Sequence, residues 1–200
     1  MHDYRIIVVA IMAAFLIASQ PGATARAAAI NHPAPAFSLP NAATGSTITL
    51  DSLRRGNHAV VLIFIATKCP VSNAYNDRMQ SLAANYAAKG IAFAGINSNQ
   101  TESTAEVAEH AANHKFTFPV LKDAGNVVAD AYGARHTPEV FVVDSSGVLV
   151  YHGRIDDSME AADVHSRDLA NTLNEILAGQ PVATPETKAF GCSIKRKPVQ

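Results

Sequence analysis

The stretch AVVLIFIATKCPVSNAY, residues Ala59 to Tyr75, joins an unbroken apolar run to a polar run that begins at a cysteine and a proline. The β-branched and aromatic residues from Ala59 to Ala66 predict a strand that is covered on both faces in a mostly parallel sheet. Proline is tolerated in the first turn of a helix, where its missing N–H would have had no partner. The stretch therefore predicts a central strand that leads into a helix with Cys69 and Pro70 near its start.

The next segments alternate in the same way. Apolar residues at helical spacing from Ser72 predict a helix that ends at Gly90, and IAFAGIN, residues 91–97, reads as a second buried strand. The segment TESTAEVAEHAANH, residues 101–114, predicts a helix that begins at a Thr101-x-x-Thr104 motif. Strand, helix, strand and helix in this order indicate a right-handed parallel crossover.

The pattern changes on both sides of this unit. Two apolar runs separated by the turn residues 144–147 predict a hairpin, so the sheet is mixed. A helix over about 163–178 and a tail should follow it, and residues 34–56 should form a short hairpin before it. The predicted fold is α/β, with a central mixed β-sheet flanked by helices, an N-terminal β-hairpin extension and a C-terminal tail.

The composition narrows the range of partners. The chain has 200 residues, 48% of them hydrophobic, which is enough for one domain with a full core. The 16 Lys and Arg residues nearly balance the 17 Asp and Glu residues, so the sequence offers no basic surface for nucleic acid. We expect partners that are not polyanions.

The first residues predict export. Arg5 precedes an apolar run of about thirteen residues, which is typical of a signal peptide and short for a membrane anchor, although an uncleaved anchor remains the alternative. Small-residue sites at 23–25 and 27–29 predict cleavage between Ala25 and Ile30. We therefore divide the chain into a signal peptide, 1–29, a domain, 30–180, and a tail with Cys192, 181–200. The mature protein should be periplasmic or secreted and should meet the membrane only during export.

Cys69 and Cys192 are the two cysteines of the chain, and an oxidising compartment would allow them to form a disulfide. A cysteine in the first turn of a helix lies near unpaired backbone N–H groups, which favour the thiolate. Cys69 is therefore a candidate nucleophile; the alternative is a buried cysteine that acts as a small hydrophobic residue.

The segments FSLPNAATGSTITLDSL, VLIFIATKCPVS and HTPEVFVVDSSGVLVYHGRIDD, in this order, resemble the thioredoxin-like redoxins. The alkyl hydroperoxide reductase/thiol-specific antioxidant branch, which is peroxiredoxin-like, is the most similar. The resemblance covers about residues 34–177. It implies a thioredoxin-like fold, a redox-active Cys69 at the start of the first long helix, and a cis-proline loop at Thr137-Pro138 beside it. Such a loop exposes backbone groups with which an extended thiol partner can pair.

The sequence also departs from this family. Ser72 stands where thioredoxins carry a second cysteine, so a local two-thiol exchange is absent. Leu62 and Ala66 stand where peroxiredoxins carry a proline and a threonine, with Thr67 one place away. We therefore leave open whether the substrate is a peroxide or a protein disulfide. The residues that we expect to contact the substrate are Thr67, Pro70, Ser72, Thr137, Pro138 and Arg154. For Arg154 the alternative is an ion pair with Asp156 or Asp157.

Cys192 has two possible roles. It could resolve an oxidised Cys69, helped by Lys195, Arg196 and Lys197, or it could hold the tail in a fixed disulfide. The predicted function is an exported thiol-dependent oxidoreductase with Cys69 and Cys192 as catalytic residues, an external thiol as reductant, and no cofactor or metal. The alternatives are a redox-inactive binding or assembly protein and, with a histidine such as His136 as a further ligand, a copper-handling protein.

Overall fold

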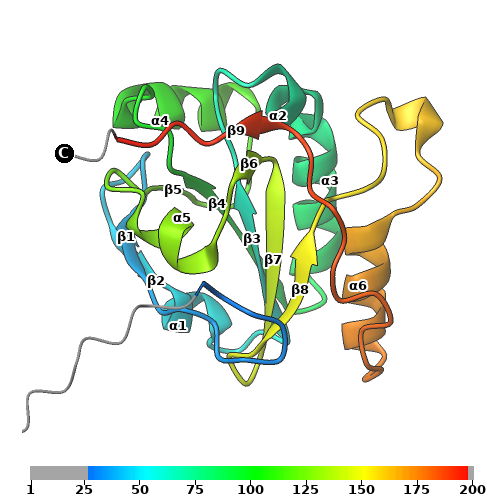
Figure 1. The fold of residues 1–200 in the computed structure, drawn as a ribbon. Coiled ribbons are helices and arrows are strands. Elements are labelled where there is room, and N and C mark those ends of the chain that lie inside the picture. Colours follow the sequence, from blue (N-terminus) through cyan, green and yellow to red (C-terminus); the bar gives the residue numbers. More distant parts are fainter. Residues whose placement is uncertain (1–26, 198–200) are drawn as a thin grey trace, which may run out of the picture.

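The structure, a computed structural model, describes residues 27–197, so the predicted signal peptide lies largely outside the described residues. Its centre is a five-stranded sheet in the order β5-β4-β3-β7-β8 (Figure 1). Strands β3, β4 and β5 are parallel, whereas β7 and β8 are antiparallel to their neighbours, which confirms the mixed sheet. The bounds are β3 Ala59–Phe64, β4 Ile91–Asn97, β5 Val120–Lys122, β7 Glu139–Asp144 and β8 Leu149–Gly153.

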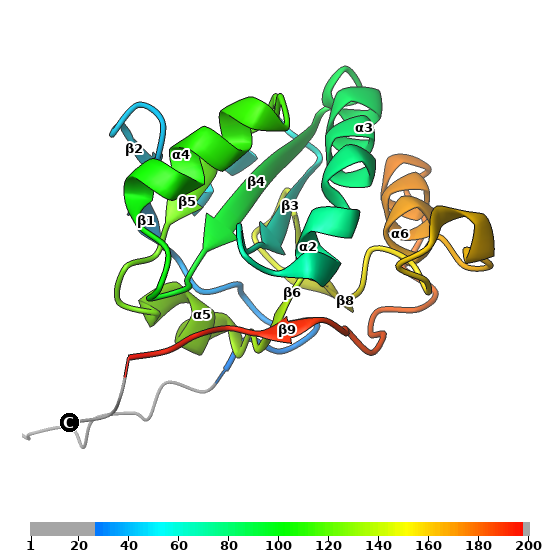
Figure 2. The same cartoon turned by 90° about the horizontal axis from the view of Figure 1, so that it is seen from above.

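Strand β3 is the middle of the core because its side chains are buried on both faces. Val61 and Ile63 belong to one apolar cluster, and Val60 and Leu62 to the other. Helices α3, Asn76–Ala87, and α6, Asp168–Leu177, cover the first face, and α5, Val127–Tyr132, covers the second (Figure 2). Burial of each large apolar side chain contributes about 1.5 to 3 kcal/mol, so this fully buried strand contributes strongly to the stability of the fold.

The helices differ from the prediction in their boundaries. The helix expected from Ser72 to Gly90 is divided at Tyr75 into α2, Pro70–Ala74, and α3. Helix α4, Thr104–Asn113, begins with a capping box of Ser103 and Glu106, so the Thr101-x-x-Thr104 start was wrong. The last helix begins at Asp168, after a short 3-10 turn at Ala161–Asp163. Helix α1, Leu50–Arg54, was not predicted. No helix in the part of the chain that the structure describes is long and apolar enough to cross a membrane.

Two small sheets complete the fold. Strands β1, Ser38–Pro40, and β2, Thr47–Thr49, form the expected N-terminal hairpin. Strands β6, His136–Thr137, and β9, Cys192–Ser193, form an antiparallel pair. Residues 181–197, the part of the predicted tail that the structure describes, therefore do not form a loose tail. They run across one end of the molecule, between α2 and α5, with β9 beside β6 (Figures 1 and 2).

Candidate functional site

The sheet register brings three loops to one edge. Phe64, the last residue of β3, pairs with Ile96 near the end of parallel β4 and with Glu139 at the start of antiparallel β7. The loops after β3 and β4 and the loop before β7 therefore leave the sheet at the same end. Cys69 is on the first of these loops and Pro138 on the last. The strand pairing alone thus explains why a cysteine and a proline far apart in the sequence meet.

Cys69 is the N-cap residue of α2, and Pro70 is the first residue of that helix. The backbone N–H of Ser72 points at the sulfur of Cys69 at 3.3 Å, and the hydroxyl oxygen of Ser72 accepts a hydrogen bond from the N–H of Ala66 at 3.2 Å. A donor at this position favours a thiolate over a thiol. Ser72 is fully buried. Through these two hydrogen bonds it holds the turn that carries the Cys69 sulfur, at the position where thioredoxins carry a second cysteine.

The Thr137-Pro138 peptide is cis, as the resemblance implies. The carbonyl oxygen of Thr137 lies 3.3 Å from the sulfur of Cys69. Glu139, which is buried, fixes this loop: one carboxylate oxygen accepts hydrogen bonds from the N–H groups of Arg135 and His136 at 2.6 and 2.7 Å. Its other oxygen contacts His152 Nε2 at 2.7 Å. A buried carboxylate thus anchors the backbone beside the sulfur.

A second buried carboxylate anchors the other side of the site. Glu102 accepts hydrogen bonds from the N–H groups of Thr67 at 2.8 Å and Lys68 at 3.1 Å, directly before Cys69. The side chains of Asn97 and Asn99 donate to the same carboxylate. Four donors satisfy its two oxygens, which offsets the cost of removing the charge from water. The loop that presents Cys69 is therefore held by the end of β4.

Lys122 completes this network. Its buried ammonium group donates to Asn97 Oδ1 and Asn99 O at 2.7 Å and to Glu102 O at 2.6 Å. Burial lowers the pKa of Lys122, and the nearby charge of Glu102 opposes that shift. The ammonium and the carboxylate thus compensate each other's charge under the loop that carries Cys69.

Cys192 is bonded to Cys69, with their Cα atoms 6.0 Å apart, which lies within the usual range for disulfides. Its backbone pairs with Thr137 in the β6–β9 ladder, so both the sulfur and the main chain of Cys192 lie against the candidate site. Cys69 is 3% exposed, whereas Cys192 is partly exposed. An incoming thiol would therefore meet the sulfur of Cys192 more readily than that of Cys69.

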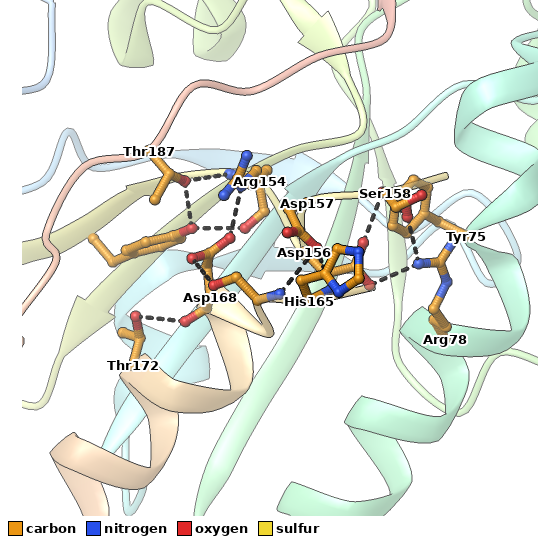
Figure 3. A network of polar contacts seen from close by, with 12 residues as sticks. Tyr75, Arg78, Arg154, Asp156, Asp157, Ser158, His165, Asp168, Thr172 and Thr187 are labelled. Atoms are coloured by element: carbon orange, nitrogen blue, oxygen red, sulfur yellow. Dashed lines mark hydrogen bonds and ion pairs between the residues drawn. The ribbon is translucent and has the colours of Figure 1, made fainter. Parts of the chain in front are cut away.

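Arg154 has partners of its own. Its Nε donates to Asp168 at 2.6 Å, and its backbone N–H donates to Thr187 Oγ1 at 3.0 Å (Figure 3). The ion pair is with Asp168 on α6 and not with Asp156, whose carboxylate instead pairs with Arg78 at 2.7 Å. Among the described residues Arg154 has no polar contact with Cys69 or with the cis-proline loop.

The structure brings together most of the residues predicted for the site. Cys69, Pro70, Ser72, Thr137, Pro138 and Cys192 lie in one cluster, with Thr67 on the same loop. Sequence reasoning missed Glu102 and Lys122. A buried acidic residue leaves no signal in a single sequence, because the donors that justify its burial come from other loops.

No three His, Cys, Asp or Glu side chains gather into a group that could hold a metal ion within residues 27–197. His136, a ligand in the copper hypothesis, lies on β6 with a buried Nδ1 that has no hydrogen-bond partner among these residues.

The mixed sheet, the helix that begins at Cys69 and the cis-proline loop beside it define a thioredoxin-like fold. The chain belongs to the AhpC/TSA family, whose model matches residues 30–152. It is 30% identical over 106 residues to the thiol-disulfide oxidoreductase ResA of Halalkalibacterium halodurans, a match that covers 53% of this chain and 58% of that relative.

Two solved structures are similar over most of this chain. One is a hypothetical protein from Sinorhizobium meliloti 1021, with 33% identity and a TM-score of 0.79, and the match covers 86% of this chain and 97% of that one. The other is an uncharacterized conserved protein from Geobacillus kaustophilus, with 31% identity and a TM-score of 0.81, covering 86% and 94% of the two chains. The shared architecture therefore extends beyond the residues that the family model matches.

The two buried carboxylates predict how stability depends on pH. Burial alone would raise the pKa of Glu102 and of Glu139, but their hydrogen bonds outweigh it and hold both values below the ordinary value of 4.5. Such groups stabilise the fold above the ordinary pKa, and this stability is lost as the pH falls through the lowered value. We expect the free energy of unfolding in urea to be steady between about pH 7 and 5.5 and to fall steeply below about pH 4.5.

The matched control is Glu139→Gln, which removes one of the two carboxylates. The decrease in the free energy of unfolding between about pH 5.5 and acid pH should be smaller in this variant than in the wild type. If the free energy of unfolding depends on pH identically in the two proteins, Glu139 does not contribute to the loss of stability in acid.

Proposed function

We propose that this chain is an exported thiol-dependent oxidoreductase in which Cys69 is the redox nucleophile and Cys192 is its resolving partner. The observation that carries this proposal is the Cys69–Cys192 disulfide beside the cis-proline loop. The N–H of Ser72 supports the role of Cys69, because it would stabilise a thiolate both as attacking group and as leaving group.

The proposed oxidative half-reaction begins at the reduced pair. With a disulfide substrate, the Cys69 thiolate attacks one sulfur, a bond forms to that sulfur, and the other sulfur leaves as a thiolate with the electron pair. With a hydroperoxide, Cys69 takes the terminal oxygen to become a sulfenic acid, and the alcohol or water leaves. The Cys192 thiolate then attacks Cys69 and releases the second thiol or a water molecule.

The reductive half-reaction consumes two external thiols. The first thiolate attacks the partly exposed Cys192 sulfur, and Cys69 leaves as a thiolate that the Ser72 N–H can stabilise. A second thiol then attacks the mixed disulfide, frees Cys192 and leaves as the external disulfide. The pair thus returns to two thiols, and no cofactor is needed.

Export is part of the same proposal, since a lasting disulfide of this kind requires an oxidising compartment. The N–H of Ala28 donates to Ala131 O at 2.9 Å, and Asn31 donates to Leu149 O at 2.8 Å. Cleavage after Ala25 would keep these contacts, whereas cleavage after Ala29 would remove the first. We therefore favour Ala25 as the last residue of the signal peptide.

The test is to reduce the mature protein, add one equivalent of hydrogen peroxide or cystamine, alkylate the remaining thiols and locate the modification by peptide mass spectrometry. We expect a transient adduct or sulfenic acid on Cys69, followed by the Cys69–Cys192 bond and its reversal by dithiothreitol. If both thiols remain unmodified with both oxidants, the proposed function is wrong.

The second candidate is a binding protein with a structural disulfide. It is favoured by the extensive contacts of the C-terminal residues on either side of Cys192, which suit a fixed clasp. This candidate predicts that both cysteines matter equally and only for stability.

A further inference from the structure

The cis-proline loop has a short backbone edge, strand β6, which the chain itself fills. Strand β9 pairs with it antiparallel, with Thr137 opposite Cys192 and His136 opposite Ser193. An exposed backbone edge of this kind is where an extended polypeptide can add as a further strand. In this protein the place beside the Cys69 sulfur is occupied by residues Phe190 to Lys197, which we call the cover segment.

The cover segment is anchored after Cys192 by contacts that do not depend on the disulfide. The N–H of Ile194 donates to Arg135 O at 2.9 Å, and the Ile194 side chain is 6% exposed in the apolar core. The backbone N–H of Lys195 donates to Asn99 Oδ1 at 2.7 Å, and the backbone carbonyl oxygen of Lys195 accepts from the N–H of Gln100 at 2.9 Å. The segment is thus tied to the loop after β4 as well as to β6.

The next residues extend this anchor onto α5. Arg196 Nε donates to Asp130 at 2.8 Å, and its NH2 group donates to Ala134 O at 2.6 Å. The N–H of Lys197 donates to Asn126 Oδ1 at 3.3 Å. Each of these hydrogen bonds contributes about 1 kcal/mol, and none of them involves the disulfide. Reduction of the Cys69–Cys192 bond therefore leaves this anchor in place.

A second anchor lies just before the cover segment and at its first residue, Phe190. The N–H of Thr187 donates to His152 O at 3.0 Å, and its hydroxyl shares a hydrogen bond of 2.7 Å with the Tyr151 hydroxyl. The ring of Phe190 packs edge-on against Tyr75, with 6.3 Å between ring centroids. The chain is therefore held on both sides of Cys192.

Gly191 allows the segment to lie directly on the cis-proline loop. Its φ of +145° disfavours residues with a side chain, and a Cβ at this position would overlap the carbonyl group of Thr137. The backbone at Gly191 thus takes the space next to the residue that precedes Pro138, which an incoming peptide would need.

We propose that the cover segment stays bound in both redox states and restricts Cys69 to small oxidants, either hydroperoxides or disulfides of low molecular weight. This inference rests on the proposed function and narrows its substrate. Small molecules can reach a sulfur without pairing to the backbone, whereas an extended polypeptide needs the β6 edge, which the cover segment fills. The anchors on both sides keep that edge filled after Cys192 is reduced.

The experiment compares variants in which Cys69 is the single cysteine. Cys192→Ser keeps the cover segment, and Gly191→Ala in the same background pushes it off the loop. A chain that ends at Thr187 removes it entirely and serves as a second opened variant, and thermal unfolding checks that each one is folded. The probes are cystamine and a ten-residue extended peptide whose central cysteine is bonded to 2-aminoethanethiol, and intact mass gives the rate of the Cys69 adduct.

We expect the covered variant to react at least about tenfold faster with cystamine than with the peptide, since the lost strand pairing is worth more than one hydrogen bond. Opening the segment should raise the peptide rate and reduce this ratio by about tenfold. The control Ser193→Ala, an exposed position in the same segment, should leave the ratio unchanged.

An equal ratio in the covered and the opened folded variants would overturn the inference while leaving the proposed function intact. A Cys69 that reacts with neither probe, nor with hydrogen peroxide, in any variant would overturn the proposed function and this inference with it.

Discussion

Replacing Cys69 with serine is expected to abolish oxidant-dependent thiol oxidation, with a loss of at least about 100-fold, because the Cys192 thiol that remains is not at the start of a helix and lacks the Ser72 N–H that contacts the Cys69 sulfur. Cys192→Ser should still form the adduct or sulfenic acid on Cys69 but should not complete an internal disulfide. The measurement is the rate of substrate thiol oxidation, together with the mass of the protein after a single exposure to oxidant.

The two cysteine variants form a matched pair. Each removes the same bond between residues 123 apart, so each should lose about 2 to 5 kcal/mol of stability in urea. Any difference in activity then reflects chemistry and not folding. If both variants lose stability alike while Cys69 in Cys192→Ser shows no reaction, the structural-clasp alternative is correct and the redox role is wrong.

The second large effect is expected at Glu102. In Glu102→Gln the side chain keeps its size but replaces one acceptor oxygen with an NH2 group, which would face donors such as the N–H of Thr67 or Lys68. The substitution also removes the negative charge that stabilises the buried Lys122 ammonium. Each buried N–H left without its acceptor costs about 1 to 3 kcal/mol, and loss of the negative charge near Lys122 adds to this cost, so the loop that carries Cys69 should loosen.

Urea unfolding and the rate of the Cys69 adduct test this prediction together. The matched control is Glu109→Gln, a carboxylate exposed on α4, which should change stability by less than about 0.5 kcal/mol. A Glu102→Gln protein as stable as this control would show that the network under the loop does not hold the site.

The central strand, the crossover and the β7–β8 hairpin were predictable because each is encoded locally, by an apolar run or by turn residues. The break at Tyr75 was not, because the helical pattern of apolar residues continues through it, whereas the Tyr75 hydroxyl is drawn to Asp156 and to Ser158 O at 2.8 Å, more than eighty positions further along the chain. The start of the last helix was placed early because Val164 fits the apolar pattern, although regular hydrogen bonding begins only at Asp168.

The candidate site shows the same division. Cys69 and Pro70 could be identified from their residue types and their place between an apolar run and a helical pattern, and the family resemblance implied the cis-proline loop. The position of the C-terminal residues could not be read from the sequence, since FGCSIKRK has no strong strand pattern and is ordered by pairing to β6 and by burial of Ile194. Only the three-dimensional structure distinguishes a loose tail from a strand that covers the site.

The crosslink between Cys69 and Cys192 also determines how the protein responds to mechanical force. A force that pulls on the chain from the C-terminal side reaches Cys192 and passes through the sulfur bond to Cys69, so the enclosed β4, β5, β7 and β8 carry no tension. While the bond is intact, these strands cannot be drawn out one by one. An oxidised molecule should therefore resist a processive unfolding protease that starts at this end, and reduction should remove that resistance.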